Sequence, residues 1–143
     1  QNNNEEQNAS YIEGSVELSI VNQKGEDLLN PLHPNTVDIS KIEVYYLING
    51  EKVKYSKPML TYSKGYHIFK HENEYRIAIF VNISGSTPKL TTIVKWEENK
   101  EDKIEVQFEN STNSIVQNNI WLNGKHIWER YINDEDSFFI LTK

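Results

Sequence analysis

The residues best suited to bind a ligand lie beside the dipeptide Asn123-Gly124, toward the end of the chain. Asn-Gly between two apolar runs predicts a two-residue hairpin turn. That turn predicts four cross-strand pairs on alternating faces: Ile120 with Ile127, Leu122 with Lys125, Trp121 with His126, and Asn119 with Trp128. If the isoleucine face joins the core, Trp121 and Trp128 lie diagonally on the outer face.

Two indoles on one outer face predict a saccharide site, because flat aromatic rings stack on sugar rings. Asn119, His126 and Arg130 supply polar groups that can bond to sugar hydroxyls. The other interpretation is that the chain's own loop covers this face, since Trp is highly buried on average and a Trp pair is usually packing. The ligand-site hypothesis therefore rests on Trp121, Trp128, Asn119, His126 and Arg130.

No segment predicts a metal or a cofactor. The acidic turn 133–137 offers oxygen ligands of the kind that calcium prefers, but it lacks the EF-hand spacing and the central glycine. The histidines do not follow a zinc pattern, because His67 and His71 are four residues apart on an expected strand. Cysteine is absent, which excludes thiolate ligands and a cysteine nucleophile.

The sequence also lacks the motifs of the common enzyme classes, including the Gly-x-Ser-x-Gly elbow, the Walker loop and the dinucleotide fingerprint. Its 21 Asp and Glu residues are spread along the expected strand exteriors. We therefore expect no enzymatic activity. A hydrolase whose carboxylate pair meets only in space is the alternative that sequence cannot detect.

The net charge of -6 repels phosphate backbones and anionic lipid, so we expect no nucleic-acid partner. No apolar run is long enough to span a bilayer. The sequence starts at Gln1 rather than Met, and we expect that a secretory signal has been removed upstream. Membrane attachment is then expected only through a lipid anchor upstream of Gln1.

Most of the chain alternates apolar and polar residues with the period of a half-buried strand. Val16, Leu18 and Ile20 form the first such run, and Tyr75 to Ile83 form the longest, which predicts a central strand. Asn49-Gly50 predicts a hairpin that pairs Tyr46 with Val53 and Val44 with Tyr55. The final strand is expected at 137–142.

A further hairpin is predicted around a charged loop at 98–102. Folding it symmetrically about Lys100 gives two apolar pairs on one face and two opposite-charge pairs on the other: Trp96 with Ile104, Val94 with Val106, Lys95 with Glu105, and Glu97 with Lys103. Agreement between the apolar and the charged pairs favours this register.

No segment of ten or more residues keeps a helical apolar period. The pattern predicts one all-β domain at residues 11–143, an antiparallel β-sandwich of about eight to ten strands, immunoglobulin-like or transthyretin-like, with a β-barrel as the alternative. Residues 1–10 carry one apolar residue and predict a flexible polar tether.

The stretch LTTIVKWEENKEDKIEVQFENSTNSIVQNNIWLNGKHIWE, residues 90–129, resembles the C-terminal half of small lipoproteins of unknown function from Bacteroides-type bacteria. The resemblance implies a sandwich fold, a periplasmic or cell-surface setting, and a tether at 1–10 that follows a lipidated cysteine. It implies no activity and no residue roles. Residues 14–28 (GSVELSIVNQKGEDL) are also similar to the opening strand of transthyretin-like and carboxypeptidase regulatory-like sandwiches.

Together these features predict a secreted, non-enzymatic surface or periplasmic module that binds or spaces an unknown protein or glycan partner. The first alternative is a glycan-binding module that uses Trp121 and Trp128. The second is the hydrolase with a spatially assembled carboxylate pair.

If residues 1–9 are a tether, proteolytic trimming will remove them without changing the melting temperature, because they have no apolar face to dock. Thermal unfolding followed by circular dichroism measures this. A melting temperature lowered by several degrees would show that the segment pairs as a strand.

Overall fold

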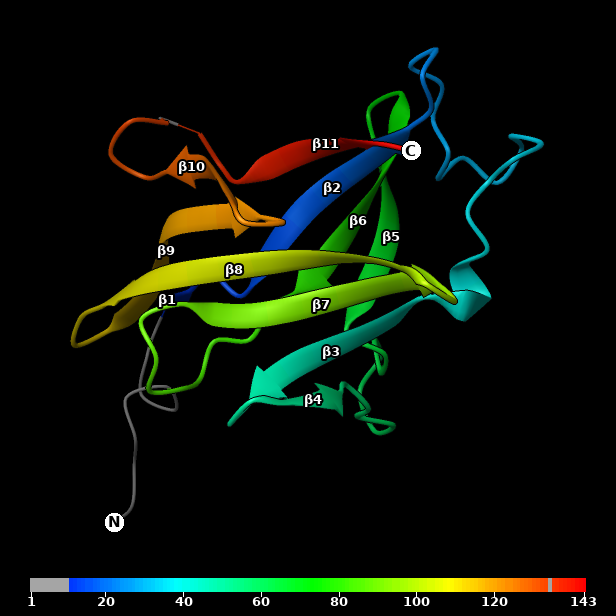
Figure 1. Ribbon diagram of the computed structural model, residues 1–143. Coiled ribbons are helices and arrows are strands. Elements are labelled where there is room, and N and C mark those ends of the chain that lie inside the picture. Colours follow the sequence, from blue (N-terminus) through cyan, green and yellow to red (C-terminus); the bar gives the residue numbers. More distant parts are fainter. Residues whose placement is uncertain (1–10, 134) are drawn as a thin grey trace.

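The computed structural model describes residues 11–133 and 135–143, which form an all-β sandwich of two sheets (Figure 1). The predicted tether at 1–10 lies outside these residues. The strands are β1 (Tyr11–Ile12), β2 (Ser15–Val21), β3 (Glu43–Ile48), β4 (Glu51–Lys54), β5 (Tyr66–His71), β6 (Glu74–Phe80), β7 (Leu90–Glu97), β8 (Lys100–Asn110), β9 (Ser114–Leu122), β10 (Lys125–Glu129) and β11 (Phe138–Thr142). One 3-10 turn, η1 (Ile39–Lys41), precedes β3. The described part of the chain contains no helix long and apolar enough to cross a membrane.

The first sheet has the order β1-β9-β8-β7-β3-β4, with β10 also paired to β9, and the second has the order β11-β2-β6-β5. The core lies between the two sheets, where alternate residues of each strand point inward. Val16, Leu18 and Ile20 of β2 are buried there, as their alternation predicts. The expected central strand is also confirmed, because β6 lies between β2 and β5.

The strands of both sheets pair mainly antiparallel, as expected, but each sheet also contains one parallel pair. β1 pairs in parallel with β9, and β11 pairs in parallel with β2. Each parallel strand lies near one end of the chain and joins a partner far away in sequence. Alternation records which face of a strand is buried but not the direction of its neighbour, so these two pairings carry no local signal.

The β3–β4 hairpin has the predicted register. Tyr46 lies opposite Val53, and the N–H of Tyr55 donates to the carbonyl of Val44 at 2.8 Å. Asn49 and Gly50 have φ angles of 53° and 82°, the pair of positive values that a type I′ turn requires.

The predicted register of the β7–β8 hairpin is wrong. Thr92, not Trp96, lies opposite Ile104, and Lys95 lies opposite Glu101. The turn is tighter than expected, because Asn99 adopts a φ of 63° and Glu97 already pairs with Lys100. A bulge between residues 95 and 97 accommodates the change.

The displacement amounts to four positions along the partner strand, an even number, so every side chain keeps its predicted face. Trp96 and Ile104 are therefore both in the core. The main consequence concerns Asp102, which was expected in an exposed loop. It is 8% exposed and belongs to the inward face of β8.

Asp102 joins four segments of the chain. Its carboxylate accepts hydrogen bonds from Trp96 Nε1 at 2.7 Å and from Asn123 Nδ2 at 2.8 Å, and it forms an ion pair with Lys143 after β11. Desolvation raises the pKa of Asp102, but the hydrogen bonds from Lys143, Asn123 and Trp96 together lower it by more than desolvation raises it. The net shift of the pKa is therefore downward. The carboxylate therefore stays ionised although it is buried.

The tight β7–β8 turn can be tested at Asn99. Asn99→Gly should leave the free energy of unfolding nearly unchanged or raise it, because glycine adopts a positive φ without strain. Asn99→Val should lower it by about 1–2 kcal/mol, because a β-branched residue resists that conformation. Urea unfolding of the two variants makes the comparison, and equal stability would indicate the longer loop instead.

Candidate functional site

The β9–β10 hairpin follows its predicted register for two pairs and then departs from it. Asn123 and Gly124 have φ angles of 51° and 86°, and they bring Leu122 opposite Lys125 and Trp121 opposite His126. A bulge then occurs between His126 and Trp128, so that Ile120 lies opposite Trp128. The predicted pairs of Ile120 with Ile127 and of Asn119 with Trp128 are therefore wrong.

This single extra residue separates the two predicted tryptophans. Trp128 joins the core cluster with 6% of its surface exposed. Trp121 follows the buried Ile120 on β9, so it lies on the outer face of the sheet and is half-buried. Because a bulge reverses the alternation beyond it, the expected pair of indoles on one face does not form.

Three of the five predicted residues do meet on the outer face. The rings of Trp121 and His126 lie 5.1 Å apart, and His126 Nε2 is 2.8 Å from Asn119 Oδ1. Two residues that sequence analysis did not single out complete this group. Asn119 Nδ2 donates to Gln107 Oε1 at 2.7 Å, and Lys89 Nζ lies 3.9 Å from the centre of the Trp121 ring.

We name this group the Trp121 patch: Lys89, Gln107, Asn119, Trp121 and His126. Its polar side chains keep hydrogen-bonding capacity after their mutual bonds are made. Gln107 retains its side-chain NH₂, Asn119 retains one amide hydrogen, and His126 retains Nδ1. The patch therefore combines one aromatic ring with several donors and acceptors of fixed direction.

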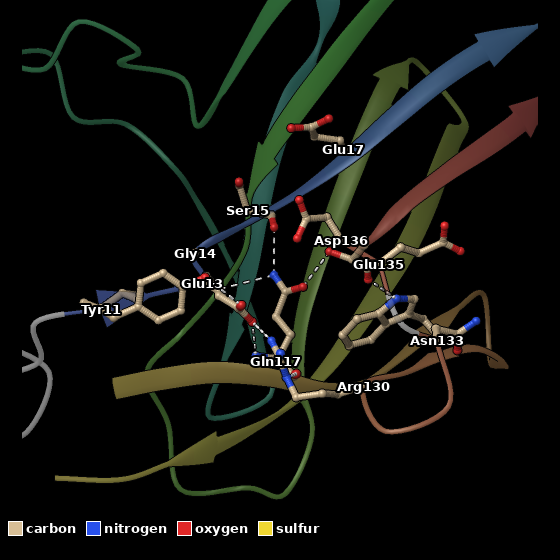
Figure 2. Close-up of a pocket in the computed structure, with 13 residues that line it drawn as sticks. Tyr11, Glu13, Gly14, Ser15, Glu17, Gln117, Arg130, Asn133, Glu135 and Asp136 are labelled. Atoms are coloured by element: carbon tan, nitrogen blue, oxygen red, sulfur yellow. Dashed lines mark hydrogen bonds and ion pairs between the residues drawn. The ribbon is translucent and has the colours of Figure 1, made fainter. Parts of the chain in front are cut away.

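The other two predicted residues, Trp128 and Arg130, line a polar recess of about 410 Å³ between the two sheets (Figure 2). We name it the end recess. Glu13, Gln117, Glu135 and Asp136 also line it. The indole Nε1 of Trp128 donates to the carbonyl of Glu135 at 3.2 Å, so the chain's own 133–137 segment partly covers this tryptophan.

Arg130 and Glu13 close a gap along the edge of β9. β1 pairs with β9 at Ser114 and Ile115, β10 pairs with it from Asn119 onward, and Gln117 lies between the two. The carboxylate of Glu13 accepts the backbone N–H of Gln117 at 2.8 Å, and Arg130 Nε donates to the Gln117 carbonyl at 2.7 Å. Arg130 and Glu13 also form an ion pair with each other. The two side chains thus satisfy the backbone groups that a neighbouring strand would otherwise satisfy.

The pKa of Glu13 reflects this position. Burial raises it, but hydrogen bonds from Arg130, from the N–H of Gln117 and from Tyr11 lower it by more, so the net shift is downward. Glu13 is therefore ionised at neutral pH. A general acid for glycoside hydrolysis needs the opposite shift.

The side chain of Gln117 connects three segments across the end of the sandwich. It is 2% exposed, its Nε2 donates to the carbonyl of Ser15 at 2.7 Å, and its Oε1 accepts from Ser137 Oγ at 2.6 Å. Sequence analysis missed this residue. The sequence could have indicated it, because Gln117 is a polar residue two positions after Ile115, on the side of the strand that otherwise carries apolar residues.

The remaining candidates are dispersed. His67 and His71 are both on strand β5, where His67 stacks on Tyr62 with ring centres 4.3 Å apart. The acidic turn 133–137 includes Asp134, which lies outside the described residues. Among residues 11–133 and 135–143, no group of three or more His, Asp or Glu side chains is placed to hold a metal ion.

Comparison with known proteins adds no relative to these observations: no family model, no curated protein and no solved structure matches the chain. The functional interpretation therefore depends on the geometry of the Trp121 patch and the end recess.

The role of the Glu13–Arg130 pair predicts a pH-dependent stability. Glu13→Gln retains an acceptor for Gln117 but loses the ion pair, so at pH 7 the free energy of unfolding should fall by about 1–3 kcal/mol. The pKa of Glu13 is lowered from its ordinary value of 4.5, so the stability that ionised Glu13 contributes is complete above that value and is lost as pH falls through the folded-state pKa. The difference between the variant and the wild type should therefore shrink below pH 4.5.

Thermal unfolding at a series of pH values measures this difference. Glu98→Gln is the matched control, because the Glu98 side chain is 82% exposed and, among the described residues, forms an ion pair only with Lys95 at the surface. A Glu13→Gln deficit that stays constant from neutral to acidic pH would contradict the assigned role.

Proposed function

We propose that the protein is a non-enzymatic binding module of the cell surface or periplasm, and that it binds a saccharide at the Trp121 patch. One observation carries the proposal: an indole on the outer sheet face lies beside side-chain amides and an imidazole whose directions are fixed by bonds of 2.7 and 2.8 Å. A pyranose ring presents an apolar face and a rim of hydroxyls. The patch offers a complementary surface, an aromatic face with a polar rim.

The position of Trp121 also favours a binding role. Ile120 and Leu122 on either side of it already contribute to the core, so packing of the sandwich does not require an aromatic residue at position 121. The Lys89 side chain over the Trp121 ring is exposed, so a ligand can displace it, while the bond to Asn119 holds His126 in place. A cation–π contact at an exposed site is worth only about 0.5–1 kcal/mol, so displacement of Lys89 costs little.

The end recess is less suited to a ligand, although it is a concavity of about 410 Å³. The polar groups of Glu13, Gln117 and Arg130 are engaged with one another and with backbone groups. A ligand would have to break these bonds, whose loss would open the edge of β9. The polar groups of the recess therefore have a structural role.

The surface or periplasmic setting is supported by the resemblance of residues 90–129 to bacterial lipoproteins. Residues 1–10 would then act as the spacer between the anchor and the domain. The module would present its outer sheet face, with the Trp121 patch, to a glycan outside the cytoplasm.

The proposal predicts that Trp121 fluorescence responds to a saccharide. Trp96 and Trp128 are each 6% exposed, so a change in emission on titration with a panel of oligosaccharides will report mainly on Trp121. Trp121→Ala should weaken binding at least tenfold, a change of about 1.4 kcal/mol, while the far-ultraviolet circular dichroism stays unchanged.

Tyr45→Ala is the matched control. Tyr45 is also an aromatic residue of this sheet with a lysine over its ring, at 4.9 Å from Lys52, but its hydroxyl bonds to Glu43 rather than to an amide. This variant should bind like the wild type. The proposal fails if iodide cannot quench Trp121 in the native protein, or if no saccharide in the panel binds.

A further inference from the structure

Lys89 differs from the other lysines on the outer face of this sheet. Four of them form ion pairs with glutamates: Lys52 with Glu101, Lys54 with Glu43, Lys95 with Glu98, and Lys103 with Glu105. None of the described residues forms an ion pair with Lys89. Its ammonium lies instead over the Trp121 ring at 3.9 Å.

None of the other four residues of the Trp121 patch carries a carboxylate that could pair with the Lys89 ammonium. Two glutamates border the patch: Glu129 lies opposite Asn119 on β10, and Glu105 lies opposite Trp121 on β8. The Glu105 carboxylate is already engaged, since Glu105 Oε1 is 3.7 Å from Lys103 Nζ. The five side chains of the patch thus include one ammonium and no carboxylate, although the whole chain carries -6.

The place of Lys89 on the ring links this charge to the ligand. A sugar that stacks on Trp121 must displace the Lys89 ammonium from the ring. Because the backbone of Lys89 stays in place, the displaced ammonium remains close to the edge of the bound sugar. A carboxylate on the sugar would meet the ammonium there. The amides of Gln107 and Asn119 would remain available for hydroxyls.

We propose that the ligand of the Trp121 patch is an acidic saccharide, one whose sugar rings carry a carboxylate as uronic acids do, and that Lys89 selects it. This inference rests on the proposed saccharide-binding function and narrows its substrate class. Lys89 acts as a specificity-determining residue, and Trp121 supplies the stacking surface common to neutral and acidic sugars.

The test compares β-linked trisaccharides of glucuronic acid and of glucose, which differ only in the carboxylates, by isothermal titration calorimetry at low salt. The wild type should bind the glucuronic acid trisaccharide at least tenfold more tightly. Lys89→Met keeps the length of the side chain without its charge and should abolish this preference. Lys95→Met removes an ion-paired lysine of the same face and should retain it.

Each result separates the two proposals. Equal affinity of the wild type for both trisaccharides overturns the acidic class but leaves saccharide binding standing. A preference that survives in Lys89→Met overturns the role of Lys89. Absence of binding to either trisaccharide and to the wider saccharide panel overturns the proposed function and this inference together. Added salt should reduce the preference, because exposed charges are screened.

Discussion

The position of the last strand depends on two buried polar contacts between the sheets. β11 belongs to the second sheet through its pairing with β2, but both of its ends bond to the first sheet. At one end Ser137 donates to the buried amide of Gln117, and at the other Lys143 pairs with the buried carboxylate of Asp102. A buried polar group without a partner costs free energy, so each contact selects one arrangement of the strand and disfavours the alternatives.

Side chains also complete the edge of the first sheet where strands are missing. β9 has two short partners on one edge, and the gap between them is filled by the ion pair of Glu13 and Arg130, which satisfies the backbone of Gln117. Arg130, which the sequence analysis placed in a ligand site, therefore has a structural role. The chain crosses from β1 in one sheet to β2 in the other just after Glu13.

Bulges decide which of the aromatic side chains faces solvent. The extra residue in β10 directs Trp128 into the core, and Trp121 across the hairpin stays on the outer face. Had the hairpin been regular, both indoles would have shared one face, and neither the end recess nor the Trp121 patch would have its present composition. One inserted position thus separates a structural tryptophan from a candidate binding residue.

Local pattern in the sequence determined the class of the fold, the buried faces of most strands and the Asn-Gly turns, because alternation and turn chemistry act between residues that are close along the chain. That is why the shifted β7–β8 register still left Trp96 and Ile104 in the core, and why three of five predicted site residues met on one face. The parallel pairings, the bulges, the burial of Asp102 and Gln117, and the place of Lys89 over Trp121 were decided only by the tertiary structure. These features depend on contacts between segments far apart in sequence, where the free energy of satisfying buried polar groups outweighs any local preference.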